Sequence, residues 1–166
     1  ENYDELKDYV RSISGNLSTE LDYIKTNNVI IDAILNSKYK ETLDKGIVFI
    51  FQISDLSGIK MRDEDIVVIL SNLLNNAIEA CEKCSGKKVM KMKLVKEKDN
   101  IIISVKNTYD GKLNIKDGEI QTSKKYEMDE HGIGIKNIIE VITKYQGSYA
   151  IRNENNEFYF SVILPN

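Results

Sequence analysis

Residues 63–84, DEDIVVILSNLLNNAIEACEKC, carry two stripes at helical spacing. The apolar stripe predicts a helix that packs on a core, with Asp63 as its cap, and consists of Ile66, Ile69, Leu70, Leu73, Ala77 and Ala80. The polar stripe runs beside it and consists of Asn72, Asn76, Glu79 and Lys83. Asparagine does little for a helix, but its amide oxygen is a hard neutral ligand that suits Mg²⁺. The alternative interpretation of the polar stripe is a solvated helix face.

Strand patterns surround this helix. The β-branched and aromatic stretch Ile47–Ile53 predicts a buried strand. Two hairpins follow, residues 88–96 with 101–107 and residues 148–151 with 158–164. A further helix is expected between Gly132 and Gly147. Helices combined with a mostly antiparallel sheet predict an α+β fold, a two-layer α/β sandwich.

The N-terminal part has a different pattern. Residues from Tyr3 to Asp44 carry apolar residues at helical spacing, with an expected interruption at residues 15–19 and an end at Gly46. This charged, amphipathic segment is not a core by itself, so we expect it to pack against a partner helix in this chain or in another copy. The sequence therefore predicts a helical arm, residues 1–45, followed by a globular domain, residues 46–166.

Composition limits the classes of function. The chain is 42% hydrophobic and 30% charged with a net charge of −3, which indicates a folded globular chain and argues against a nucleic-acid surface. Its longest apolar runs are too short to cross a bilayer. The chain does not begin with Met, so we expect an excised part of a longer protein. Cys81 and Cys84 form a lone CxxC, and the only histidine in the sequence is His131. A redox or zinc site needs further partners, so we expect ordinary reduced thiols.

Two further features could bind a ligand. Gly132-Ile133-Gly134 opens a helix, where glycines allow close approach and free N–H groups suit phosphate. Taken alone, this short motif is a weak signal, and a flexible hinge explains it better. The polar segment Tyr109–Glu130 before it is unusually long for a loop, which often indicates function. Asn107 stands where a strand meets this segment, and it could bind a base edge or form a turn.

Together these motifs resemble a known family. Residues 72–80, NLLNNAIEA, resemble the N box of the superfamily that contains histidine kinases, gyrase and heat-shock chaperones, and residues 131–138, HGIGIKNI, resemble its G2 box. Thr122-Ser123-Lys124 resembles the lid of the peptide-pheromone receptor kinases of Gram-positive bacteria, which act in quorum sensing. Residues 32–38, DAILNSK, resemble the end of the second dimerisation helix of those kinases. The resemblance implies a Bergerat-type ATP-binding fold, and an arm that is a remnant of the dimerisation and phosphoacceptor domain without its phosphoacceptor helix.

The resemblance also implies roles for single residues. Asn76 would hold the Mg²⁺ that bridges the phosphates of ATP, and Asn72 would help to contact metal or phosphate. Lys124 would reach the terminal phosphates from the lid. Asn107 stands where relatives use an aspartate to bind the adenine amino group. The G2 box would bind the phosphates through His131, Gly132, Ile133, Gly134 and Ile135.

The implied function is the ATP-binding catalytic domain of a two-component sensor histidine kinase. It would transfer the γ-phosphoryl group to a histidine on a helix absent from this chain, and His131 would have a local role rather than accept phosphate. The implied partners are that helix, a response regulator, and a second copy in the full-length protein, without nucleic acid. We expect a cytoplasmic domain, joined to the membrane only through an N-terminal sensor domain. The alternatives are an anti-sigma-type serine kinase, which would want a glutamate where Val68 stands, and an interaction module that has lost nucleotide binding.

Overall fold

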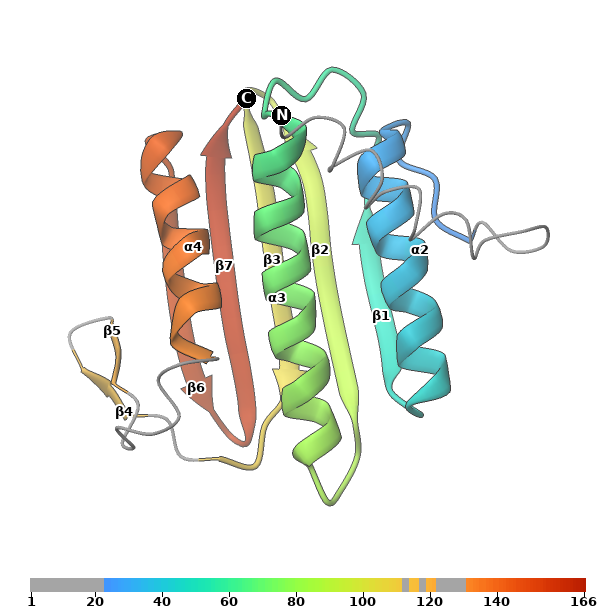
Figure 1. The fold of residues 1–166 in the computed structure, drawn as a ribbon, viewed down its shortest axis with the longest axis vertical. Helices are drawn as coiled ribbons and strands as arrows, with labels where there is room; N and C mark the ends of the chain where they lie inside the picture. Colours follow the sequence, from blue (N-terminus) through green and yellow to red (C-terminus); the bar gives the residue numbers. More distant parts are fainter. Residues whose placement is uncertain (1–22, 112–113, 117–118, 122–130) are drawn as a thin grey trace.

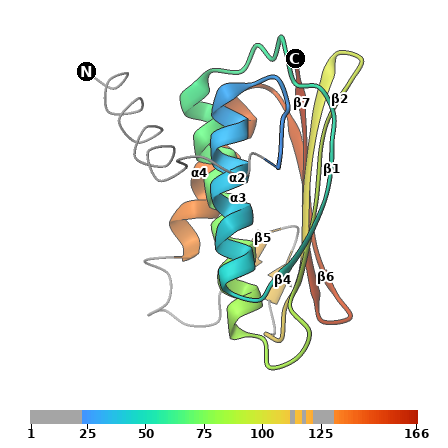
Figure 2. The ribbon, with the colours of Figure 1, turned by 90° about the vertical axis from the view of Figure 1, so that its right-hand side faces the viewer.

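The computed structural model describes residues 23–111, 114–116, 119–121 and 131–166. Within these ranges, a five-stranded sheet is covered on one face by three helices and is open on the other (Figures 1 and 2). The strands are β1 (Val48–Ile53), β2 (Val89–Glu97), β3 (Asn100–Thr108), β6 (Ser148–Glu154) and β7 (Glu157–Pro165). The helices are α2 (Val29–Asp44), α3 (Asp63–Lys83) and α4 (His131–Lys144). The predicted α+β sandwich is confirmed.

The strand order is β1-β2-β3-β7-β6, in which β1 runs parallel to β2 and the other neighbours are antiparallel. Alternate residues of a strand face opposite sides of a sheet. The side that meets the helices is apolar, and on the three central strands its buried residues are Met90, Met92, Leu94, Ile101, Ile103, Val105, Phe160, Val162 and Leu164. This apolar side forms one layer of the core.

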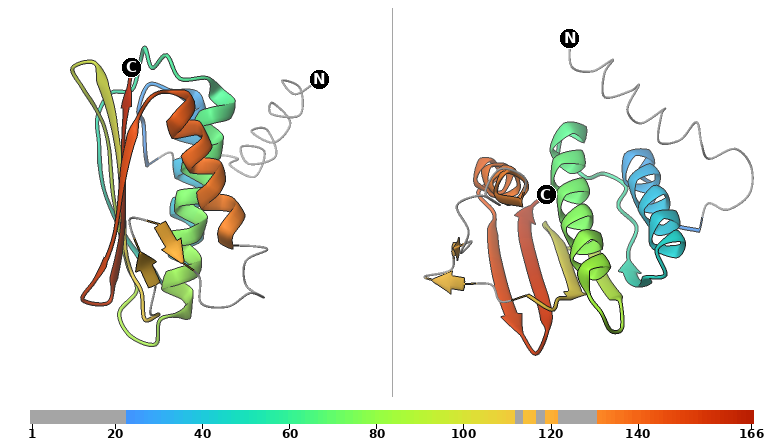
Figure 3. Two further views of the ribbon diagram at one scale, coloured as in Figure 1. Left: turned by 90° about the vertical axis from the view of Figure 1, so that its left-hand side faces the viewer. Right: turned by 60° about the horizontal axis from the view of Figure 1, so that its bottom comes forward.

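Helix α3 supplies the centre of the other layer. Its predicted apolar stripe is buried from Ile66 to Ala77, and only Ala80, one turn later, is partly exposed. Helix α4 lies next to α3 over β7 and β6 (Figure 3). The two helices are joined at one end by Asp65, whose carboxylate accepts hydrogen bonds of 2.7 Å from both the Lys144 ammonium and the Tyr145 hydroxyl. This contact fixes the start of α3 to the end of α4.

Helix α2 packs on the same core. Asn28 caps it by accepting hydrogen bonds from the N–H groups of Ile30 and Ile31, and residues 23–28 before it are not helical. Ile31, Ile34 and Leu35 are buried in one cluster with α3 and the sheet. The partner that this helix was expected to need is therefore present in this chain. The division of the chain at residue 45 stays a prediction, and residues 1–22 lie outside the described part.

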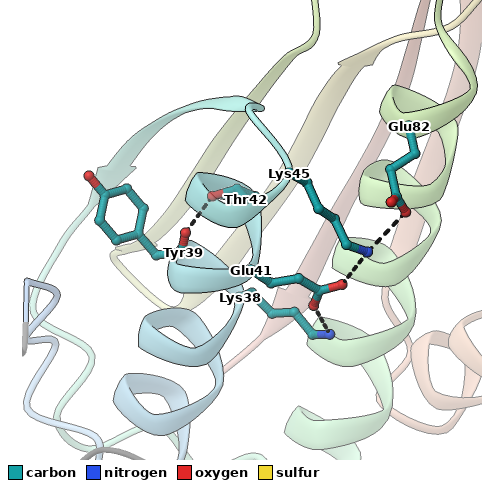
Figure 4. A network of polar contacts seen from close by, with 6 residues as sticks. All are labelled: Lys38, Tyr39, Glu41, Thr42, Lys45 and Glu82. Atoms are coloured by element: carbon teal, nitrogen blue, oxygen red, sulfur yellow. Dashed lines mark hydrogen bonds and ion pairs between the residues drawn. The ribbon is translucent and has the colours of Figure 1, made fainter.

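Charged residues join α2 to α3 on the surface (Figure 4). Glu41 accepts hydrogen bonds from Lys38 at 2.7 Å and from Lys45 at 2.8 Å, and Lys45 also contacts Glu82 of α3 at 2.9 Å. Burial raises the pKa of Glu41, but the two lysines outweigh it, and the net pKa lies below its ordinary value. Because these groups are partly solvated, the network orients the helices more than it stabilises them.

Three local predictions differ from the structure. Asp63 does not cap α3: the cap is Arg62, without a side-chain hydrogen bond, and Asp63 stands in the first turn, where the helix dipole favours a carboxylate. Strand β1 was expected to be buried, but it lies at the edge of the sheet and Phe49 is its one buried residue. The segment after Tyr109 contains a small hairpin, β4 (Asn114–Lys116) with β5 (Glu119–Gln121), that the sequence analysis missed.

Two asparagines form the turn between β6 and β7. Asn155 and Asn156 have φ angles of 53° and 60°, as a two-residue hairpin of the favoured type requires. Asparagine tolerates this left-handed conformation better than most residues.

Among the helices described, none is long and apolar enough to cross a membrane.

Candidate functional site

The polar stripe of α3 is not uniformly solvated. Glu79 and Lys83 are exposed, whereas Asn72 and Asn76 are half-buried on the side that faces α4. The side-chain amide of Asn72 donates to the carbonyl oxygen of Val68 at 2.7 Å. This bond uses the nitrogen of the amide and leaves its oxygen, Oδ1, directed at α4. The two asparagines are therefore distinguished from the rest of the stripe by their surroundings.

Gly134 is the point on α4 that they meet. A methyl group added to Gly134 would lie 2.9 Å from Oδ1 of Asn72 and 3.7 Å from Oδ1 of Asn76. The two amide oxygens thus converge on the backbone of α4 one turn from its start, in a space that only glycine leaves open. The sequence placed these motifs on two separate helices, and the structure brings them together.

The start of α4 has a second property. The helix begins at His131, so the N–H groups of residues 131–133 have no partner within the helix. Such a turn attracts anions through its free donors and its dipole. The structure describes only the backbone of residues 131–133, while Ile135 is partly buried against the core. The arrangement combines anion-binding donors with two neutral oxygen ligands.

Asn107 lies at the end of β3, on the side of the sheet that faces the helices. Its side chain is among the few buried polar ones, with 2% of its surface exposed. Its Nδ2 donates to the carbonyl oxygen of Thr108 at 2.9 Å, but its Oδ1 has no hydrogen-bond partner. A buried acceptor without a donor is rare and calls for an explanation, such as a ligand.

The neighbours of Asn107 hold this corner in place. The hydroxyl of Thr108 accepts a hydrogen bond from the Val89 N–H at 3.2 Å and lies 3.5 Å from the Sγ of Cys81. Cys81 and Cys84 are separate, buried thiols. Burial raises the pKa of Cys81, which disfavours the reactive thiolate. Cys81 therefore acts here as a packing residue.

The elements that carry the site residues meet at one end of the molecule. The end of β3, the second half of α3 and the start of α4 all lie at the bottom of Figure 1. The structure thus brings Asn72, Asn76 and Gly134 into contact and places Asn107 at the same end. Lys124 lies outside the described residues. Sequence reasoning missed Thr108, because a main-chain carbonyl leaves no signal in a sequence.

The donors present fit a magnesium nucleotide. Mg²⁺ binds a few hard oxygen ligands of the protein and completes its shell with water and phosphate oxygens. The Oδ1 atoms of Asn72 and Asn76 are such ligands, and they lie beside a helix start that suits phosphate. The described residues contain no group of three or more acidic, histidine or cysteine side chains that could hold a metal. Among the described residues, the oxygen ligands that converge beside the start of α4 are the two neutral amides.

Known structures share this fold. The nucleotide-free catalytic domain of the histidine kinase ThkA superposes with a TM-score of 0.64 at 20% identity, over 84% of this chain and 94% of that one. The Acinetobacter baumannii histidine kinase AdeS gives 0.58 at 14% identity, over 95% and 74%. The mycobacterial sensor histidine kinase MprB gives 0.60 at 15% identity, over 82% and 91%. At identities this low, the structural matches establish a common fold and nothing more.

Comparison of the sequence with known families identifies the family of this chain. No curated protein sequence matches the chain. A family model described as a GHKL domain matches residues 61–165, which is more than half of the chain and includes α3, β3 and α4. The matched range contains the paired asparagines, the orphaned amide oxygen of Asn107 and the glycine start of α4. The chain therefore belongs to the GHKL domain family.

Proposed function

We propose that this chain is the ATP-binding catalytic domain of a two-component sensor histidine kinase. The observation that carries the proposal is the convergence of the Asn72 and Asn76 amide oxygens on Gly134, beside the free N–H groups at the start of α4. These groups suit the phosphates of a nucleotide and its Mg²⁺. The fold shared with histidine kinase catalytic domains supports the kinase assignment.

Each group has a distinct task in this proposal. When bound, Mg²⁺ neutralises charge on the phosphates. Asn76 would hold the metal through Oδ1, Asn72 would support metal or phosphate, and the free N–H groups at the start of α4 would bind phosphate oxygens. Asn107 lies at the base end of the nucleotide, and Lys124 approaches the terminal phosphates. Positioning and charge neutralisation are the main sources of catalysis in phosphoryl transfer.

The wider assignment rests on the resemblance of the motifs. In the full-length protein, the γ-phosphoryl group goes to a histidine on a separate helix of a dimer and then to a response regulator. The kinase belongs to the peptide-pheromone receptors of quorum sensing, and this domain lies in the cytoplasm beneath a membrane-bound sensor. Val68, where an anti-sigma-type kinase would want a glutamate, provides no carboxylate for activating water.

A binding titration tests the proposal. A fluorescent ATP analogue should bind in the presence of Mg²⁺ and much more weakly with EDTA. Asn76→Ala should weaken Mg²⁺-dependent binding by roughly tenfold or more, as expected when a contact to a charged group is lost. Asn75→Ala is the matched control, since Asn75 is the exposed neighbour on the same helix, and it should bind normally.

The same titration addresses the rival functions. A chain that binds no nucleotide with or without Mg²⁺ is an interaction module that retains only the fold. Equal affinity of Asn76→Ala and the unsubstituted chain would mean that the paired asparagines do not form the metal site. Circular dichroism of both variants separates a lost ligand from a lost fold.

A further inference from the structure

The face of the sheet that points away from the helices is covered by none of the described elements (Figure 2). Side chains alternate along a strand, and residues paired across neighbouring strands point to the same face. Met90, Met92 and Leu94 of β2 are buried on the helix side, so Lys91 and Lys93 between them point to the open face. The strand register then identifies the open-face residues of the other strands.

One row of paired residues that crosses this face is mostly cationic. Lys91 of β2 pairs with Lys106 of β3, and Lys106 pairs with Tyr159 of β7. Tyr159 in turn pairs with Arg152 of β6. Neighbouring strands lie about 4.8 Å apart, so the row extends about 14 Å from Lys91 to Arg152. It contains no acidic residue.

The adjacent row carries hydroxyl groups. Lys93 pairs with Ser104, and Ser104 pairs with Ser161. The two serine hydroxyls lie 2.8 Å apart, and the Tyr159 hydroxyl donates to Oγ of Ser104 at 3.5 Å. Hydrogen bonds with the two serines lower the pKa of Tyr159, and the charges of Arg152 and Lys93 lower it further, although burial opposes them. The centre of the face is therefore a cluster of hydroxyl groups in a positive field.

These two rows, from Lys91 to Arg152 and from Lys93 to Ser161, are called the basic band below. Acidic side chains border it on both sides. Glu97 lies at the end of β2 and accepts a hydrogen bond from Lys93 at 3.0 Å. Glu154 and Glu157 pair across the turn between β6 and β7, where Glu157 also contacts Lys106. Exposed ion pairs of this kind are weak, so another anion can replace them.

Lys91 and Arg152 keep their charge uncompensated. Both are exposed, and neither forms an ion pair with another described residue. The whole chain has a net charge of −3, so the basic band is a local reversal of sign. Carboxylates accept strong hydrogen bonds from ammonium and guanidinium groups and also bind hydroxyl groups. The band therefore complements an anionic partner that carries carboxylates.

The shape of the basic band favours a single acidic chain as this partner. Its two rows lie only about 7 Å apart, and the carboxylates of Glu97 on one side and of Glu154 and Glu157 on the other repel anions beyond them. A membrane or a nucleic acid presents anions over a wider area and would meet these carboxylates. An extended polypeptide of four or five residues, at about 3.3 Å for each residue, covers the length of the band alone.

We propose that the basic band docks an acidic segment of a partner polypeptide, which lies across β2, β3, β7 and β6 with its carboxylates on the cations and hydroxyl groups. The band and the helices that carry Asn72, Asn76 and Gly134 lie on opposite faces of the sheet (Figure 2). Docking and nucleotide binding thus use separate surfaces, and this proposal does not depend on the proposed function.

A fluorescein-labelled peptide of eight glutamates tests the proposal by fluorescence anisotropy. The chain should bind this peptide at low salt and release it as salt is added, because 0.1 M salt screens exposed charges beyond about 10 Å. Lys91→Glu combined with Arg152→Glu should reduce the affinity about tenfold or more, since it reverses the charge at both ends of the longer row. Lys25→Glu combined with Lys40→Glu is the matched control. It changes the net charge equally at exposed positions before and within α2, and it should bind nearly normally.

Three outcomes of these titrations would overturn the proposal. The first is that the unsubstituted chain does not bind the peptide at low salt. The second is an equal loss of affinity in both double variants, which would mean that net charge alone attracts the peptide. The third concerns competition: unlabelled peptide should displace the labelled one at a lower concentration of anionic groups than phosphatidylserine vesicles or duplex DNA. The reverse order would assign the band to a membrane or a nucleic acid.

Nuclear magnetic resonance locates the peptide without any substitution, and so decides the question if a variant fails to fold. Unlabelled peptide should shift the amide resonances of Lys91, Ser104, Tyr159 and Arg152 and leave those of α2 unchanged. Shifts confined to the start of α4 would place the peptide at the candidate phosphate site, and would contradict docking on the open face.

Discussion

Because Gly134 has no side chain, α4 can approach Asn72 and Asn76 closely. A methyl group there would meet the end of a flexible side chain, Oδ1 of Asn72, at 2.9 Å. The end of a side chain can move, whereas a backbone cannot. A substitution of Gly134 should therefore change the geometry of the site while leaving the stability of the fold nearly unchanged.

We predict that Gly134→Ala folds normally but binds Mg-ATP more weakly. Alanine favours a helix by about 1 kcal/mol over glycine, which offsets the contact with Asn72. The displaced amide of Asn72 no longer points at the site. Thermal melting should shift by only a few degrees, while a nucleotide titration should show a clear loss of affinity. Unchanged affinity would mean that the position of Asn72 is irrelevant to binding.

Asp65 gives a second prediction at this scale. Burial raises its pKa, but the hydrogen bonds from Lys144 and Tyr145 lower it more, so that the net pKa lies below its ordinary 3.8. The stabilisation is therefore complete above the unfolded pKa and is lost as the pH falls through the folded one. Asp65→Asn should destabilise the chain by about 1–3 kcal/mol at neutral pH, and the difference should shrink below pH 4.

Urea unfolding of both chains across this pH range measures the effect of Asp65. Asp63→Asn is the control, because it removes a carboxylate from the same first turn of α3 without breaking the contact to α4. A destabilisation that stays constant from neutral to acidic pH would contradict the assigned ionisation of Asp65.

The site residues differ in how far the sequence could predict them. Helical spacing fixes which residues share a face, so the grouping of Asn72 with Asn76 follows from the sequence. The contact of both with Gly134 does not, because it depends on how two helices pack. The orientation of the Asn107 amide depends on a main-chain carbonyl, for which every residue type is equivalent.

At the scale of elements, the join between α4 and β6 contains a closely packed glycine, Gly147. A Cβ on Gly147 would meet the carbonyl oxygen of Ile163 at 2.6 Å and the side chain of Leu164 at 2.5 Å. The first of these atoms belongs to the backbone of β7 and cannot move without distorting the sheet. Gly147 is thus required by packing, while the left-handed turn falls on Gln146.

We predict that Gly147→Ala destabilises the chain by about 2 kcal/mol or more, the range for overpacking at a rigid site. Gly86→Ala is the control, since nothing lies within 4 Å of its added Cβ, and it should change stability little. Chemical denaturation of the two variants measures the difference. Equal stabilities would show that β6 can shift away from β7 at low cost.

Most elements were predictable to within a few residues because alternation and helical spacing are strong signals. Strand β1, both large hairpins and α3 belong to this group. The cap of α3 was not predictable, because carboxylates are favoured both as caps and in the first turn of a helix. Asp63 fits either pattern. The hairpin β4–β5 has only three residues in each strand, too few for a periodic pattern.

At the scale of the whole molecule, the only histidine of the chain, His131, stands at the start of α4. Transfer of a phosphoryl group needs the acceptor nitrogen in line with the leaving oxygen, at a distance of about 3–3.5 Å. If the start of α4 binds the phosphates as proposed, a residue of that turn would approach them from the side. An acceptor on another polypeptide has no such restriction.

We therefore predict that the chain does not label itself with radioactive ATP. Adding a separate polypeptide that carries the phosphoacceptor helix should give acid-labile label on that polypeptide alone. Label on this chain that is lost in His131→Gln would contradict the prediction and make the chain a different kind of enzyme.

The hydrogen bonds of Asn36 have a consequence for protein engineering. Oδ1 of Asn36 accepts from the N–H of Ile24 at 3.0 Å, and its Nδ2 donates to the carbonyl of Ile24 at 2.8 Å. The N–H and the hydroxyl of Thr26 both donate to the Asp32 carboxylate at 2.7 Å. The chain is therefore committed to its tertiary structure from Ile24 onward. A hybrid receptor that places a foreign sensor upstream should be spliced before this residue, because a junction at residue 46 would discard α2 and leave the apolar side of α3 in water.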